Sequence, residues 1–272
     1  MKRVLSPILL IILTISPPTR TDTQDETTTD TQPKIRLNLF TYLYNETNPR
    51  RIKEYLLCLN KNRNHPMIKR IHVNYDTSND PEKTGVLHQY LKEHGIEISY
   101  AQGRLTISEC MRLINELFPD DYVIFSNADI WFNDTLLRLD KEHIEGKVLG
   151  LSRRGSLRFP YSQDTWIFKT PFLADHPFLE KTYIGLPNCE KPIIHVARKV
   201  MGLHVYNPSC SIHCMHEHKS RVRHHEDINH WGIIPLPYCR LDGTIPERTP
   251  YKRRASPKGE TSQKKDCGSL TA

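Results

Sequence analysis

Short apolar runs and segments with helical periodicity alternate along the first half of the chain. Four runs have the length and composition of strands, and they lie at residues 35–44, 68–75, 96–100 and 122–125. Between them, apolar residues recur every three or four positions, which predicts helices at 49–60, 81–94 and 105–118. Strands that alternate with helices form βαβ units. The pattern therefore predicts an α/β fold with a mainly parallel central sheet flanked by helices.

Shorter elements follow in the second half of the chain. Apolar segments at 136–139 and 148–151 precede the run YSQDTWIF at 161–168. The spacing of apolar residues predicts a helix at 192–201, which Gly202 ends, and a strand at 203–206. A dense polar sequence, SIHCMHEHKS, then occupies residues 211–220.

The two ends of the chain differ in composition from its middle. Residues 1–19 begin Met-Lys-Arg and continue with an apolar stretch shorter than the ~20 residues of a membrane span, which predicts a signal peptide or a short signal anchor. Residues 20–33 form a Thr-rich flexible stalk, 34–240 one folded domain, and 241–272 a basic polar tail expected to be disordered. We therefore expect a protein of the secretory pathway lumen or a secreted one, anchored in a membrane only if residues 1–19 are retained.

The charge, the cysteines and the sequons indicate which partners and covalent modifications to expect. The net charge of +7 owes much to the basic tail, and no nucleic-acid-binding motif accompanies it, so we expect no nucleic-acid partner. Seven cysteines are compatible with one or two disulfides in an oxidising lumen, and the odd count leaves at least one thiol without an intrachain partner. Two sequons, beginning at Asn45 and Asn133, would be glycosylation acceptors in a eukaryotic lumen.

The sequence VIFSNADIWF at 123–132 is the strongest chemical signal in the chain. If the strand continues through it, Asn127 and Asp129 project from the same face, because side chains alternate along a strand. An amide and a carboxylate then offer oxygen ligands of the kind that Mn²⁺ or Mg²⁺ prefers. The alternative is that Asp129 only begins a turn after a buried strand.

Polar residues at or after strand ends extend this candidate site. In α/β sheets, ligands bind beyond the carboxyl ends of the strands. Thr41, Asp76, Arg104 and Asp129 all lie at or near such ends. The chain contains neither G-x-G-x-x-G nor a Walker loop, which argues against a dinucleotide dehydrogenase and a P-loop enzyme.

The order of these motifs resembles that of nucleotide-sugar glycosyltransferases of the GT-A fold, over roughly residues 35–220. The motifs are the strand with Thr41, VNYDTSND at 73–80, NAD at 127–129, SQDTWIF at 162–168, LPNCE at 186–190, YNPS at 206–209 and HEHKS at 216–220. The resemblance implies a single Rossmann-like domain, in which the N-A-D takes the place of the metal-binding D-x-D motif. Asn127 stands where the family has its first acidic residue.

The resemblance also assigns roles to single residues. It implies that Asp129 and one of His216 and His218 hold a divalent cation, and that Glu190, ahead of the 192–201 helix, activates the acceptor hydroxyl if the reaction inverts. The implied donor is a nucleotide-sugar, for which the expected binding residues are Thr41, Asp76, Arg104 and Asn127. The implied acceptor is a glycan, a protein or a lipid. The implied activity is that of a hexosyl-type transferase.

The chemistry of sugar transfer requires the same residue types. Negative charge develops on the leaving phosphate, which a metal ion or a basic side chain stabilises. An acceptor hydroxyl is a poor nucleophile at neutral pH, so a carboxylate must take its proton, with Glu190 as first choice and Asp164 as second.

Other candidate residues each have a second interpretation. Asp164 lies two residues before Trp166, and this pair either binds a sugar or belongs to a turn and the core. Arg104 either reaches the diphosphate or is a solvated charge, and Asp76 either contacts the base or ribose or is a turn residue.

Two other functions remain open at this stage. Asn127 favours a non-catalytic sugar- or partner-binding protein that keeps the GT-A fold. The second alternative is a secreted zinc-binding protein, with zinc held by residues drawn from Cys210, His213, Cys214, His216 and His218. The absence of H-E-x-x-H counts against a zincin.

Overall fold

The computed structural model describes residues 35–154, 163–186, 189–220, 236 and 238–244. The chain divides into two units, 1–32 and 33–272, and every described residue belongs to the second. The predicted signal segment, the stalk and the tail beyond residue 244 lie outside the described residues. Among the described residues, no helix combines the length and hydrophobicity that a membrane span requires.

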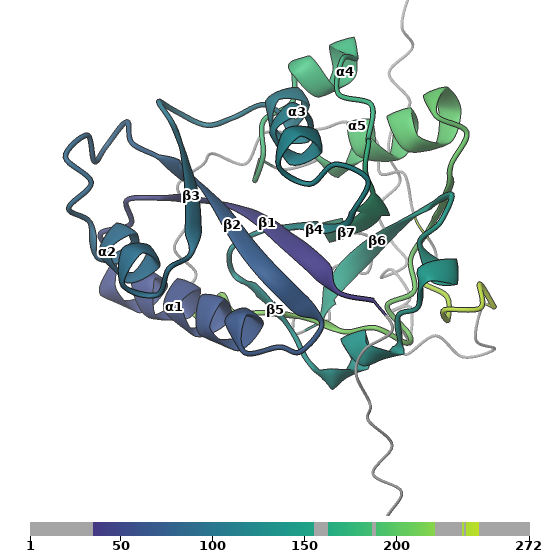
Figure 1. Ribbon diagram of the computed structural model, residues 1–272, viewed down its shortest axis with the longest axis horizontal. Helices are drawn as coiled ribbons and strands as arrows, with labels where there is room; N and C mark the ends of the chain where they lie inside the picture. Colours follow the sequence, from purple (N-terminus) through teal and green to yellow (C-terminus); the bar gives the residue numbers. More distant parts are fainter. Residues whose placement is uncertain (1–34, 155–162, 187–188, 221–235, 237, 245–272) are drawn as a thin grey trace, which may run out of the picture. The chain divides into compact units, whose positions relative to one another are not determined.

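Nine strands and five α-helices are found in the described part of the chain (Figure 1). The strands are β1 Leu37–Tyr44, β2 Ile68–Asp76, β3 Glu97–Ala101, β4 Tyr122–Ser126, β5 Ile130–Phe132, β6 Lys147–Arg154, β7 Gln163–Lys169, β8 His204–Tyr206 and β9 Cys214–His216. The helices are α1 Pro49–Arg63, α2 Val86–Glu93, α3 Ile107–Leu117, α4 Pro177–Glu180 and α5 Glu190–His195, which continues as a π-helical turn at Val196–Val200.

The strands form one mixed sheet in the order β3-β2-β1-β4-β7-β6-β9-β5, with β8 also paired to β6. The first four strands are parallel, as their βαβ connections require. Strand β7 runs antiparallel to β4 and β6, and β5 runs antiparallel to β9. The α/β prediction is thus confirmed, with the parallel pairing concentrated in the first half of the domain.

Alternation along the strands divides the core into two layers. In β1, Leu37, Leu39 and Leu43 pack in the layer that contains residues of α1 and α2. Phe40, between them, packs in the opposite layer with α3. Figure 1 shows α1 and α2 on one side of the sheet and α3 on the other. Both faces of the sheet are covered, and the central strands β1 and β4 are accordingly buried along nearly their whole length.

Two helix starts show how local hydrogen bonding sets the boundaries. Helix α3 begins after Thr106, whose hydroxyl caps the backbone N–H of Glu109 while the Glu109 carboxylate accepts from Thr106. Helix α2 begins at Val86, five residues later than predicted, because the Asp80 carboxylate accepts from the backbone N–H groups of Thr84 and Gly85. These bonds hold the 80–85 segment as a turn.

The six described cysteines are all free thiols, and Cys267 lies outside the described residues. The described part of the chain therefore contains no disulfide, although the cysteine count is compatible with one or two.

Candidate functional site

The N-A-D segment is a turn, and the strand geometry expected for it is wrong. Strand β4 ends at Ser126, and the backbone N–H of Ile130 donates to the carbonyl of Asn127, which closes a turn over 127–130. The side chains of Asn127 and Asp129 consequently have different partners. Asn127 donates to Asp164 Oδ1 at 3.2 Å, whereas Asp129 contacts Arg51 of α1 and His216 of β9.

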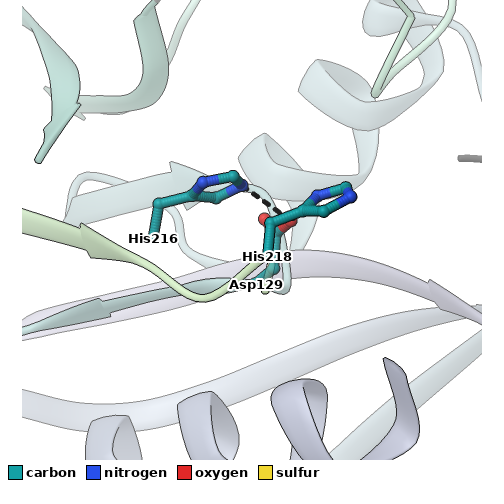
Figure 2. Close-up of side chains that lie close together, drawn as sticks. All are labelled: Asp129, His216 and His218. Atoms are coloured by element: carbon teal, nitrogen blue, oxygen red, sulfur yellow. Dashed lines mark hydrogen bonds and ion pairs between the residues drawn. The ribbon is translucent and has the colours of Figure 1, made fainter. Parts of the chain in front are cut away.

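Asp129 is the centre of the first polar cluster. Its side chain is buried, with a relative exposure of 6% for the residue. Oδ2 accepts from Arg51 Nη2 at 2.6 Å and from His216 Nε2 at 3.0 Å, and it lies 3.6 Å from His218 Nδ1. Figure 2 shows both imidazole rings next to the carboxylate. The structure thus brings together the three metal-ligand candidates of the sequence analysis.

Strand pairing brings His216 to Asp129 across 87 residues of sequence. Strand β9 pairs antiparallel with β5, so that Ile130 lies opposite His216. Beyond β9, the backbone N–H of Glu217 donates to the Asp129 carbonyl at 2.9 Å. Backbone hydrogen bonds therefore fix the position of the 216–218 segment, from which the two histidine side chains reach the carboxylate.

The Asp129 carboxylate is held in its charged form. Burial raises its pKa, but the hydrogen bonds from His216 and His218, together with the positive charge of Arg51, outweigh burial and hold the pKa well below the usual range. A carboxylate that stays ionised in a buried position requires a compensating cation. Arg51 is such a cation in this structure.

The donor set fits a divalent ion. One oxygen of Asp129 and one nitrogen of each histidine lie within 4.8 Å of one another. Within the described residues, the buried atoms Asp129 Oδ1 and His218 Nε2 have no hydrogen-bond partner. One carboxylate and two imidazoles are ligands that suit Mn²⁺ and also other transition ions. The unpartnered oxygen and nitrogen are the kind of atoms that a bound ion would satisfy.

The wider zinc site of the alternative interpretation does not form. His213 contacts Arg154 at 2.6 Å, and the Cys214 thiol contacts the Ser152 carbonyl. Among the described residues, the group suited to a metal ion is limited to Asp129, His216 and His218.

Glu190 and Asp164 interact electrostatically and form a second cluster, which the Asn127–Asp164 hydrogen bond links to the turn that carries Asp129. Glu190 is the first residue of α5 and is partly buried. Burial raises its pKa to about 7, and the nearby Asp164 carboxylate adds to the rise. Asp164, in β7, accepts from Asn127 and lies 3.5 Å from Arg153 Nε. A carboxyl group that titrates near neutrality can take a proton from a hydroxyl.

Trp166 does not serve as a sugar platform. It is 3% exposed and lies against Gly150, where a Cβ atom would come within 2.7 Å of the indole ring. The glycine therefore makes room for a core tryptophan, and the interpretation that Trp166 belongs to the core is confirmed.

Asp76 and Arg104, two of the predicted donor-binding residues, each have hydrogen-bond partners within the protein. Asp76, the last residue of β2, accepts from the Tyr42 hydroxyl at 2.6 Å and from two backbone N–H groups. Arg104 donates to the Ile184 carbonyl at 3.1 Å. A pocket of about 350 Å³ follows Asp76, lined by Thr77, Ser78, Pro81, Lys83 and Gln102.

Thr41 is the exception to the strand-end pattern. It lies inside β1, three residues before the end at Tyr44, and opposite Val73 of β2. Its buried hydroxyl has no hydrogen-bond partner among the described residues. The roles of Thr41, Asp76 and Arg104 in donor binding remain predictions.

Residues of α1 complete the Asp129 cluster, and no sequence pattern predicted them. Arg51 Nη1 donates to Glu54 Oε2 at 2.9 Å, and Glu54 in turn accepts from the backbone and hydroxyl of Ser220. The Arg51 guanidinium also stacks over Tyr55, 4.4 Å from the ring centroid. The i, i+3 and i, i+4 spacing of these residues was visible, but it is common on solvated helix faces.

The chain is similar in structure to parts of several solved proteins. No family model and no curated protein sequence matches the chain. Mannosyltransferase PcManGT from Pyrobaculum calidifontis, in complex with GDP-Man and Mn²⁺, has a TM-score of 0.44 and 15% identity, over 68% of this chain and 58% of that one. S. aureus TarS 1–349 has a TM-score of 0.36 and 16% identity, over 50% and 47%.

HddC from Yersinia pseudotuberculosis has a TM-score of 0.35 and 11% identity, over 57% of this chain and 86% of that one. TarS 1–349 is also known in complex with UDP-GlcNAc. The chain thus spans about half the length of PcManGT and TarS 1–349. At this level of similarity, the residues of the site itself must carry the inference of function.

Proposed function

We propose that the chain is a glycosyltransferase that moves a sugar from a nucleotide-diphosphate donor to an acceptor hydroxyl, assisted by a divalent ion. The observation that carries this proposal is the pair of polar clusters joined by the 127–129 turn. One cluster offers a charged carboxylate and two imidazoles, and the other offers a carboxyl group with a pKa near neutrality. Sugar transfer requires a charge stabiliser and a base side by side.

The first cluster would hold the ion and the donor phosphates. Asp129, His216 and His218 would be the ligands, and the ion would stabilise the negative charge that develops on the leaving diphosphate. The pocket beyond Asp76 lies at the end of β2, at the sheet edge where α/β folds bind ligands, and it offers space for the nucleoside. The donor sugar would then lie above the turn at Asn127.

The second cluster would activate the acceptor. Glu190 in its ionised form takes the proton of the acceptor hydroxyl as the oxygen attacks the anomeric carbon. Asp164 stands close enough to raise the pKa of Glu190, and Asn127 fixes its carboxylate by donating to Oδ1. In this proposal Glu190 is the base and Asp164 tunes it. The acceptor is a glycan, a protein or a lipid, and the proposed location is the lumen of the secretory pathway.

A thermal-shift panel of UDP-, GDP- and CMP-sugars, each with and without Mn²⁺, tests the proposal. Ligands that bind the folded state raise its melting temperature by mass action. We expect one nucleotide class to stabilise the protein, and more strongly with Mn²⁺. If no nucleotide-sugar stabilises the protein in either condition, the transferase proposal fails.

A non-catalytic binding protein is the second candidate, and the Arg51–Asp129 ion pair favours it. Arg51 already neutralises the carboxylate that an active metal site would use. Incubation of the stabilising nucleotide-sugar with acceptor mixtures separates the two functions. Release of the free nucleotide (UDP, GDP or CMP) supports the enzyme, whereas tight binding without release supports the non-catalytic protein.

A further inference from the structure

Arg51 is a buried cation at the centre of the Asp129 cluster. The residue is 5% exposed, and its side chain makes three polar contacts from α1. Nη2 donates to Asp129 Oδ2 at 2.6 Å, and Nη1 donates to Glu54 Oε2 at 2.9 Å and to the Glu217 carbonyl at 3.0 Å. Arg51 therefore connects α1 to Asp129 and to the 216–218 segment, which together form the candidate metal site.

Arg51 and a divalent ion would share the Asp129 carboxylate. Oδ2 contacts Arg51 and lies within reach of both histidines, whereas Oδ1 has no hydrogen-bond partner among the described residues. A divalent ion held there would stand next to the guanidinium, and two positive charges at such a distance in a buried site repel each other. The free energy of ion binding must therefore include the cost of this repulsion.

Glu54 gives Arg51 a second anion. Its carboxylate contacts Arg51 at 2.9 Å and is fixed by the backbone N–H and the hydroxyl of Ser220, at 2.7 and 2.8 Å. Burial raises the pKa of Glu54, but the hydrogen bonds from Arg51 and Ser220 outweigh burial. The pKa of Glu54 therefore lies below its usual value. Arg51 can thus keep a charged partner when an ion takes over Asp129.

We propose that Arg51 is an internal counter-cation of the candidate metal site: it neutralises Asp129 when no divalent ion is bound and competes with the ion for that carboxylate. This inference rests on the metal site of the proposed function. It concerns ion binding alone and requires neither a donor nor turnover. According to this proposal, the positive charge of Arg51 in α1 lowers the affinity of the site for a divalent ion.

Substitution of Arg51 by methionine tests the competition directly, with Mn²⁺ alone as the probe. In EDTA, Arg51→Met should melt at a lower temperature than the wild type, because Asp129 loses its counter-charge. Mn²⁺ should restore more of that loss than it adds to the wild type. Calorimetric titration should show an Mn²⁺ affinity at least about tenfold higher than in the wild type.

Two matched variants separate charge from packing. Arg51→Lys keeps the positive charge and should show no gain in Mn²⁺ affinity. Glu54→Gln removes the negative charge of the second partner of Arg51 and should bind Mn²⁺ more weakly than the wild type. If Arg51→Met does not fold, Arg51→Gln serves in its place, because its amide can still donate to Asp129.

The outcomes distinguish this inference from the proposed function. Higher Mn²⁺ affinity in Arg51→Met supports the inference even if no nucleotide-sugar binds. Unchanged or lower affinity in a folded Arg51→Met or Arg51→Gln overturns it, even if the wild type binds a donor. Absence of Mn²⁺ binding in every variant also overturns it.

Discussion

Asp129 and Glu190 are carboxyl groups in neighbouring clusters, and their surroundings shift their pKa values in opposite directions. Burial raises the pKa of both. At Asp129, His216, His218 and Arg51 outweigh burial and hold the group ionised. At Glu190, burial is the largest cause and the Asp164 carboxylate adds to it, so that the pKa rises to about 7 although Lys191 and Arg153 act in the opposite direction. The comparison indicates two roles for one chemical group, cation binding at Asp129 and proton transfer at Glu190.

The largest effect on turnover is expected from Glu190→Gln. Loss of the base should lower the rate of transfer by about 10²- to 10⁴-fold, because the amide cannot accept the proton of the acceptor hydroxyl. Donor binding, measured by calorimetry, should stay the same. Glu180→Gln, on the exposed side of α4, is the matched control and should leave the rate unchanged. Normal turnover in Glu190→Gln would transfer the role of base to Asp164.

Asp129→Ala should have the largest effect on stability. Removal of the carboxylate leaves Arg51 buried without its closest partner, and breaking a buried ion pair costs about 3–5 kcal/mol. Urea denaturation in EDTA measures this loss, and Mn²⁺ should no longer stabilise the variant. Asp175→Ala removes an exposed carboxylate that pairs with Arg112, and it should change stability by less than about 1 kcal/mol.

The pKa of Glu190 predicts opposite pH dependences for turnover and stability. Turnover should rise through about pH 7 as the group loses its proton. Because the folded pKa lies above the ordinary value of 4.5, the folded state binds the proton more tightly. The contribution of Glu190 to the free energy of unfolding should therefore fall between about pH 4.5 and pH 7.

Glu190→Gln isolates this contribution. At pH 8 the variant should be more stable than the wild type by about 2 kcal/mol, a figure reduced for the partial exposure of the side chain. At pH 4 the two proteins should have the same stability by urea denaturation. A variant that is less stable than the wild type at pH 8 would contradict the raised pKa.

Asn127→Asp should have the smallest effect, and it tests the link between the two clusters. The amide donates to Asp164 Oδ1, and a carboxylate in its place can only repel that group. We expect a loss of about 1 kcal/mol in the free energy of unfolding at pH 8. The loss should shrink at pH 4, where carboxyl groups take up protons. Equal or greater stability at pH 8 would show that the Asn127–Asp164 contact is unimportant.

The sheet and its helices could be predicted because their signals are local. The alternation of Leu37, Leu39 and Phe40 places side chains in two layers, and the spacing of apolar residues in α3 marks its buried face. The start of α2 could not be predicted from the spacing of apolar residues. Its boundary depends on side-chain bonds from Asp80 that compete with the helix.

The candidate site was only partly predictable, because tertiary pairing assembles it. Strand periodicity suggested that Asn127 and Asp129 act together, but the turn at 127–130 separates them. The family resemblance named His216 and His218, and the structure brings both to Asp129. Arg51 lies 78 residues before Asp129 in sequence, and no local pattern distinguishes it from a surface arginine.

Calorimetric titration of the wild-type protein with UDP, GDP and CMP, in Mn²⁺ and again in EDTA, tests the central claim most directly. The claim is that Asp129, His216 and His218 hold an ion that binds the donor phosphates. We predict that one of these nucleotides binds in Mn²⁺ and that its affinity falls at least about tenfold in EDTA. Equal affinity in the two conditions would contradict a metal-held donor, and binding in neither condition would contradict the transferase.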